Sequence, residues 1–264
     1  MTIPASGDVI AVWFSCGAAS AVAAKLTLER FGDACDVRIV NNPIKDEDAD
    51  NRRFLADVSR WIGRDIESAT NSKFPDCSIE QVFDKERFMS SPFGAPCTRL
   101  LKKEARQQWE LRNLPDWTVL GFTADEQDRH DGFVLTERAT VIPVLIEARL
   151  AKSDCFRMVK EAGIELPLTY RQGYPNANCK GCVKATSPTY WNHVRAVDPD
   201  VFARRVEQSR RLGARLVRHA GKRIFLDELP PDAKGRPMKS MNVECGIFCE
   251  ERQIAAIDSA KGKP

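Results

Sequence analysis

The alternation of strand-like and helix-like segments in the first two thirds of the chain restricts the folds open to it. Residues 8–14 (D-V-I-A-V-W-F) read as a buried strand, and a helix is expected over 19–30 after a loop of small residues. The further expected strands are 36–40, 66–69, 117–121 and 140–144, and the further expected helices are 50–61, one capped by Ser78, 98–111, and one capped by Ser153 and running to Ala162. Strands that alternate with helices over short links predict an α/β fold, a Rossmann-like, doubly wound and mostly parallel sheet.

The pattern changes near Pro167, where a loop, a C-x-x-C motif, short helices and a basic stretch follow. We therefore predict two domains, a nucleotide-binding α/β domain at 1–165 and a C-terminal extension at 166–264, with a hairpin at 223–232. The chain of 264 residues is long enough for both.

The composition points to a cytoplasmic protein without a membrane segment. No run approaches the roughly 20 apolar residues that a membrane helix needs, and the N-terminus lacks the features of a signal peptide. The nine cysteines are an odd number, which fits a disulfide framework poorly. In a reducing compartment, cysteines that gather in motifs are expected to bind metal or to do redox chemistry.

The loop between the first strand and the first helix has the composition of a phosphate-binding turn. It consists of Ser15, Cys16, Gly17, Ala18, Ala19 and Ser20. Small side chains let backbone N–H groups approach an anion, and a helix N-terminus adds partial positive charge. The spacing fits neither G-x-x-x-x-G-K-[ST] nor G-x-G-x-x-G, and a tight turn without a ligand is the alternative explanation.

Cysteines form three groups in the sequence. They are Cys97, the C-x-x-C pair Cys179 and Cys182, and the tail pair Cys245 and Cys249. Thiolates bind iron–sulfur clusters or zinc, and a C-x-x-C pair brings two sulfurs to one centre. We predict a [4Fe–4S] cluster on Cys97, Cys179 and Cys182 with Cys249 or Cys245 as a possible fourth ligand. Zinc, or thiols without metal, are the alternatives, and the other four cysteines are expected to be small buried side chains.

Two charged segments suggest further partners. The basic stretch 204–223 contains a single acidic residue and could contact tRNA or DNA through backbone charge, or form a solvated helix face. The acidic run Asp46, Glu47 and Asp48 could help to hold Mg²⁺, or form the acidic first turn of the following helix.

Several motifs resemble one known family. The segment F-S-C-G-A-A-S-A-V-A-A-K-L resembles the PP-loop of the adenine nucleotide α-hydrolase-like superfamily, in particular its phosphoadenylyl-sulfate (PAPS) reductase branch. Ala19 stands where the ATP pyrophosphatases of that superfamily carry Asp in S-G-G-x-D-S. The segments G-A-P-C-T-R-L-L-K-K, G-F-T-A-D-E-Q-D-R, N-C-K-G-C and E-C-G-I-F are similar to later motifs of the reductases and keep their order. Pro96 replaces the first Cys of a Cys-Cys pair and Phe248 replaces a tail His, as in phage and plasmid PAPS reductase-like proteins.

The resemblance implies roles for individual residues. The nucleotide would be bound by residues 15–20 together with Asn41, Gly121, Glu126 and Arg129. Arg99, Lys102 and Lys103 would neutralise the phosphate and sulfate groups, or else form an ordinary charged helix surface. Cys245 corresponds to the thiol nucleophile of the reductases, and Cys249 could be the resolving thiol.

Three functions follow as alternatives. The first is a PAPS reductase-like oxidoreductase, in which thiol attack on an adenylyl sulfate releases sulfite and a thiol reductant such as thioredoxin restores the enzyme. The second is an ATP-dependent sulfur transferase that uses a sulfur donor to thiolate a nucleic acid. The third is a nucleotide- and cluster-binding module that senses without turnover.

Overall fold

The computed structural model describes residues 3–91, 94–177 and 179–238, and the chain divides into two compact units. The sheet unit contains residues 1–43, 49–70 and 105–168, and the cysteine unit contains 44–48, 71–104 and 169–264. The predicted boundary at 165/166 differs from this grouping because it places 44–48 and 71–104 in the first domain. The chain therefore leaves the sheet unit twice and returns to it before the C-terminal segment begins.

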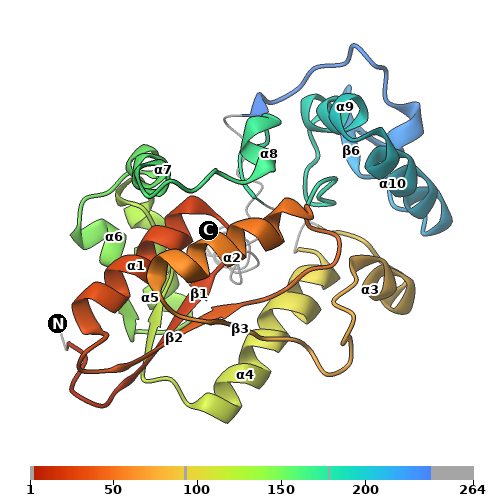
Figure 1. Ribbon diagram of the computed structural model, residues 1–264. Coiled ribbons are helices and arrows are strands. Elements are labelled where there is room, and N and C mark those ends of the chain that lie inside the picture. The colour runs from red at the N-terminus through yellow and green to blue at the C-terminus, as the bar shows by residue number, and fades with distance from the viewer. Residues whose placement is uncertain (1–2, 92–93, 178, 239–264) are drawn as a thin grey trace, which may run out of the picture. The chain divides into compact units, whose positions relative to one another are not determined.

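Within the described part of the chain, the sheet unit is built on a five-stranded parallel sheet in the order β3-β2-β1-β4-β5 (Figure 1). The strands are β1 (Val9–Phe14), β2 (Asp36–Asn41), β3 (Ile66–Ser68), β4 (Trp117–Val119) and β5 (Val141–Ile142). Phe14 pairs with Asn41, and Val12 pairs with Val119, so the carboxyl ends of the three central strands lie at one edge. The α/β class and the parallel sheet flanked by helices are confirmed.

Helices cover both faces of this sheet. Successive side chains of a strand point to opposite faces, and both Trp13 and Phe14 of β1 are buried. Phe14 stacks on Phe54 with ring centroids 6.2 Å apart, whereas Trp13 meets Trp109 edge to face at 5.6 Å. Phe54 belongs to α2 (Asp50–Ile62) and Trp109 to α4 (Ala105–Asn113), so these helices lie on opposite faces.

Helix α1 (Ala18–Phe31) follows β1 directly and packs against several other helices. It contacts α2, α6 (Val144–Glu147) and α7 (Lys152–Glu161), as Figure 1 shows. Its buried residues are small, Ala21, Val22, Ala23 and Ala24 among them. Small side chains allow neighbouring elements to approach the start of the helix closely.

The cysteine unit is mostly helical and surrounds its own apolar core. Its elements are α3 (Ile79–Glu86), the π-helix η1 (Thr98–Glu104), α8 (Leu168–Arg171), α9 (Pro188–Val197), α10 (Pro199–Arg211), the hairpin β6 (Val217–His219) and β7 (Lys222–Ile224), and the 3₁₀ turn η3 (Leu226–Glu228). The core is centred on fully buried Trp191, whose indole N–H donates to the Ala185 carbonyl at 2.8 Å. Phe83, Met89 and Leu226 pack in the same core.

The structure differs from several local predictions made from the sequence. The segment predicted as a helix at 98–111 begins as a π-helix and becomes α-helical only at Ala105. The hairpin predicted at 223–232 is wrong in position, because the strands are β6 and β7 and the turn between them is Ala220-Gly221, both at positive φ. Ser153 does not cap its helix, because the N-cap of α7 is Ala151, two residues earlier. Ser78 is confirmed as a cap, its hydroxyl accepting from the Gln81 N–H.

The helix α5 (Gln127–Thr136) is an element that the sequence pattern did not predict. It follows the short 3₁₀ turn η2 (Ala124–Glu126). Across the described residues, no helix combines the length and the apolar character needed to span a membrane.

Candidate functional site

The loop after β1 is held by a compact hydrogen-bond network around Ser20. The Ser20 hydroxyl donates to the Gly17 carbonyl at 2.9 Å and accepts from the Ser15 N–H at 3.1 Å. Cys16 adopts a φ of 56°, and extended Gly17 leads into α1. Ser15, Cys16 and Gly17 therefore form a sharp strand-to-helix turn, whereas the other three predicted loop residues, 18–20, already belong to α1. The first turn of α1 contains no acidic residue.

Gly121 and Asn41 come from the ends of β4 and β2, the strands on either side of β1, and both lie close to this loop. Gly121 follows β4, and a Cβ at that position would lie 2.9 Å from the backbone N of Ser20, so only glycine fits. The Asn41 side chain, at the end of β2, donates to the Phe14 carbonyl at 2.7 Å and lies 3.6 Å from the Cys16 Sγ. The structure thus gathers the predicted loop, Asn41 and Gly121 at one sheet edge.

The position of this edge in the topology is informative. The chain runs from β1 to β2 and β3 on one side, and then returns to β4 and β5 on the other side of β1. The order therefore reverses between β1 and β4, where the loop and Gly121 lie. Open α/β sheets bind their ligands outside the carboxyl ends of strands at such a switch point.

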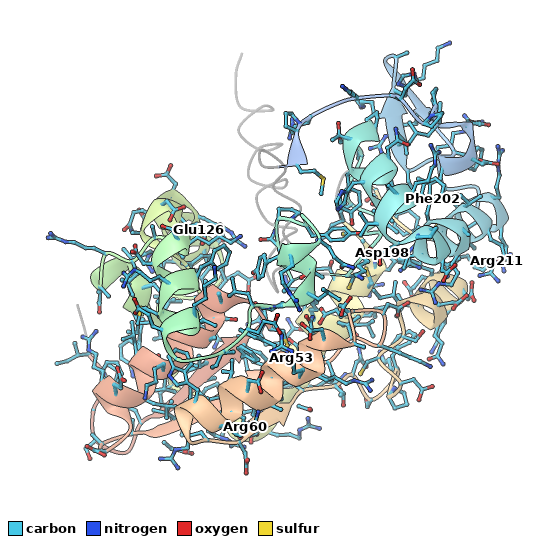
Figure 2. The ribbon with its side chains drawn as sticks, turned by 45° about the horizontal axis from the view of Figure 1, so that its top comes forward. Arg53, Arg60, Glu126, Asp198, Phe202 and Arg211 are labelled. Atoms are coloured by element: carbon cyan, nitrogen blue, oxygen red, sulfur yellow. The ribbon has the colours of Figure 1, made fainter. Side chains whose placement is uncertain are left out.

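Glu126 and Arg129 form a local pair at the start of α5. The Glu126 carboxylate accepts from the N–H and the hydroxyl of Thr123, both at 3.0 Å, and from the Arg129 guanidinium at 2.6 Å. Arg129 also lies over the ring of Phe122. Figure 2 shows Glu126 on this segment of the sheet unit. In the structure Glu126 therefore serves as a cap for the turn as well as a partner for Arg129.

The predicted anion-binding cations lie on the π-helix η1 of the cysteine unit. Arg99 pairs with Glu86 at 2.6 Å and with Glu104 at 3.0 Å. Buried Lys102 lies 3.5 Å from Glu47, and Lys103 is its neighbour on the same helix. An anion at Arg99 or Lys102 would therefore compete with carboxylates that already contact these groups.

Three of the predicted metal ligands share the core of the cysteine unit. Cys97, Cys179 and Cys182 are each less than a tenth exposed and belong to the same buried cluster. Among the described residues, no three His, Cys, Asp or Glu side chains are grouped as metal ligands. Cys245 and Cys249 lie outside the described residues. The cluster and its ligand set stay predictions.

The C-x-x-C turn is held by charged side chains that the sequence analysis did not identify. Lys180, between the two cysteines, pairs with Asp48 and with Asp198, each at 2.7 Å. Figure 2 marks Asp198, the residue directly before α10. Burial by itself lowers the pKa of Lys180, but hydrogen bonds to Asp198 and Asp48 outweigh burial and raise it. No sequence signal links these residues, because Asp48 lies far from the motif along the chain.

A second anchor acts on the next residue of the turn. Gly181 has a φ of 64°, and a Cβ there would lie 2.9 Å from Val201. Its carbonyl accepts from Arg205 Nε at 3.2 Å, and Arg205 Nη2 lies 3.8 Å from Asp46 Oδ1. Arg205 is almost fully buried. The backbone of the turn is therefore fixed by a buried guanidinium on α10.

The acidic run after β2 thus has a structural role in the cysteine unit. Asp46 also accepts from the Ile79 N–H at 2.8 Å, Glu47 faces Lys102, and Asp48 faces Lys180. The expectation that this run forms the first turn of the next helix is wrong, because α2 begins at Asp50.

The basic stretch 204–223 does not form one continuous cationic face. Arg205 is buried, Arg210 pairs with Asp227 and Glu228, and Arg211 pairs with Asp84 at 2.5 Å. The stretch spans the end of α10 and the hairpin β6–β7. Its contact with tRNA or DNA stays a prediction.

No protein-family model and no curated protein matches this sequence.

Proposed function

We propose that the chain binds an adenine nucleotide at the switch point of its sheet and acts on sulfur as a PAPS reductase-like oxidoreductase. The observation that carries the proposal is the approach of Gly121 to the backbone of Ser20 in the first turn of α1, directly after the loop that follows β1. A glycine that leaves no room for a side chain keeps the loop tight between two strand ends. The adenine specificity and the sulfur chemistry are supported by the sequence resemblance.

The phosphate end of the nucleotide would lie at the start of α1. The first N–H groups of a helix have no partner within the helix, and the helix dipole favours an anion there. No carboxylate in the first turn of α1 opposes this charge. Small side chains at Gly17, Ala18 and Ala19 leave the backbone accessible to phosphate oxygens.

The proposed reaction is a two-step thiol displacement. The thiolate of Cys245 attacks the sulfate sulfur, the bond from sulfur to the phosphate oxygen breaks, and the nucleotide leaves with its phosphate. Cys249, as thiolate, then attacks the sulfur of Cys245, which expels sulfite and leaves a disulfide. The substrate sulfur gains two electrons, and an external dithiol of the thioredoxin class reduces the disulfide.

The proposed [4Fe–4S] cluster would be held by Cys97, Cys179 and Cys182. Cys245 and Cys249 react in the proposed displacement, so neither is assigned as a ligand. Soft thiolates in a buried apolar core suit iron–sulfur ligation, and zinc suits the same donors. When bound, the cluster would supply one-electron redox chemistry. Its presence is measured as iron and acid-labile sulfide in anaerobically purified protein, and both should be lost in Cys179→Ala.

The test of the reaction is sulfite release by anaerobic protein from adenosine 5′-phosphosulfate, and from its 3′-phosphorylated form, in the presence of thioredoxin. We expect sulfite from wild type, none from Cys245→Ser, and wild-type release from the control Cys155→Ser, a buried cysteine of α7. AMP and pyrophosphate formed from ATP, with no sulfite, would replace the proposal with the sulfur transferase. Nucleotide binding without any turnover would replace it with the sensing module.

A further inference from the structure

The lysine inside the C-x-x-C motif is buried between carboxylates instead of facing solvent. Its ammonium contacts Asp48 Oδ2 and Asp198 Oδ1, each at 2.7 Å, and its side chain is 11% exposed. A lysine in a surface turn would keep its charged end in water. Burial of this charge in a four-residue turn therefore needs a structural reason.

The two carboxylates come from separate parts of the unit. Asp48 ends the segment 44–48, whereas Asp198 directly precedes α10. Asp198 also accepts from the Tyr174 hydroxyl at 2.6 Å. Lys180 therefore links the turn to two elements at once, and one of these is fixed further by a tyrosine.

The backbone on the other side of Lys180 is fixed as well. The Cys182 N–H donates to the buried Tyr190 hydroxyl at 2.8 Å, and the Gly181 carbonyl accepts from Arg205. Every residue from 180 to 182 thus has a contact to a different side chain. Such a set of contacts leaves the turn one conformation, and with it one relative position of the two sulfurs.

The presence of charged instead of apolar residues supports a role in fixing one conformation of the turn. A buried ion pair is seldom more stable than well-packed apolar residues of the same volume, and in some proteins it is retained because it selects one arrangement. Removal of one partner leaves an uncompensated charge in the core. A turn that only had to be buried could be filled by apolar side chains.

We propose that Lys180 is a positioning residue that locks the C-x-x-C turn, through Asp48 and Asp198, so that the thiols of Cys179 and Cys182 keep a fixed mutual geometry. This inference rests on the proposed function in one respect, namely that these two thiols are ligands of the proposed cluster. The lock acts through the turn, and Lys180 itself touches no substrate.

The test is the alkylation rate of each cysteine by iodoacetamide, read by peptide mass spectrometry on the full-length chain that is kept anaerobic and freed of iron by a chelator. We expect Lys180→Met to speed alkylation of Cys179 and Cys182 roughly tenfold or more, because local opening exposes them. Cys77 in the same unit and Cys155 in the sheet unit should keep their wild-type rates. Lys222→Met, on the exposed strand β7, is the matched control and should leave all rates unchanged.

A triple variant without the three charges separates the effect of Lys180 on the thiols from its effect on the stability of the fold. Lys180→Met combined with Asp48→Asn and Asp198→Asn removes the buried charges together and should restore the urea midpoint. The fast alkylation of Cys179 and Cys182 should persist in it. Wild-type rates in the triple variant, or equal acceleration at Cys77 and Cys155, would overturn the proposal. The alkylation assay needs no nucleotide, so failure to release sulfite would overturn the proposed function and leave the lock intact.

Discussion

The loop of the sheet unit and the C-x-x-C turn of the cysteine unit are both tight turns, yet they are built by opposite means. The loop is formed by small neutral residues, and Gly121 approaches its backbone because no side chain intervenes. The C-x-x-C turn is fixed by charged side chains, with Lys180 and Arg205 buried against aspartates. A turn that offers its backbone to an anion must avoid competing charge, whereas a turn that presents two side chains can use charge to orient them.

The two turns are disrupted by different kinds of substitution. Removing one member of a buried ion pair leaves a lone charge in the core, which is among the most destabilising single changes. A methyl group added at Gly121 instead forces its backbone away from that of Ser20. The following predictions run from the larger effect to the smaller.

Arg205→Met should lower the free energy of unfolding by about 3–5 kcal/mol, because it leaves Asp46 and the Gly181 carbonyl without their buried partner. Urea denaturation, followed by tryptophan fluorescence, measures the change. Arg204→Met is the matched control on the exposed side of α10 and should stay within about 0.5 kcal/mol of wild type. Equal effects from the two variants would mean that charge does not fix the turn.

Gly121→Ala should destabilise the chain by about 1–3 kcal/mol and weaken nucleotide binding, because the new Cβ would lie 2.9 Å from the Ser20 backbone. The control is Gly132→Ala in α5, where nothing lies within 4 Å of the added Cβ. It should be neutral or more stable by up to about 1 kcal/mol, since alanine favours helices. Thermal denaturation of the two variants with and without nucleotide makes the comparison. Equal shifts of the melting temperature in both variants would refute the close approach of Gly121 to Ser20.

Ser20→Ala should lower stability by about 1 kcal/mol, because the loop loses hydrogen bonds at 2.9 and 3.1 Å. Exposed Ser153, which does not cap α7, provides the comparison. Ser153→Ala should be neutral in the same urea titration. A neutral Ser20→Ala would show that the small residues alone shape the loop.

Arg211→Ala should change stability by no more than about 1 kcal/mol, because its pair with Asp84 is exposed on both sides. The effect should shrink further in 1 M salt, whereas that of Arg205→Met should persist, since buried pairs are screened less. Urea titrations of both variants at low and high salt make the comparison. A large effect at Arg211 that salt does not reduce would contradict the contrast between surface and buried charge.

The sheet unit could be predicted from the sequence to a large extent. The buried strand before Ser15 and the alternation after it are local patterns, and the expected strands and helices appear there, although β4 and β5 are shorter than 117–121 and 140–144 and α1 already begins at Ala18. Gly121 was expected to belong to the site, but only the structure shows which backbone it approaches. Helix α5 was missed because its apolar positions follow no clear helical period.

The cysteine unit could be predicted far less well, for a physical reason. Its turn is fixed by residues that lie far apart in sequence, as Asp48 and Lys180 do, and such pairings have no period or motif. The acidic run before α2 looked like the first turn of that helix because local pattern cannot show that the chain crosses into another unit at Ile44. The π-helical start of η1 likewise leaves no mark in the spacing of apolar residues.

The most direct test of the central claim is calorimetric titration of adenosine 5′-phosphosulfate into wild type, Gly121→Ala and Gly132→Ala under the same anaerobic conditions. The account predicts one binding site per chain in wild type and in Gly132→Ala, with affinity reduced at least tenfold in Gly121→Ala, a loss of about 1.4 kcal/mol. Equal affinity in all three proteins, or no binding to wild type, would contradict a nucleotide site at the switch point of the sheet.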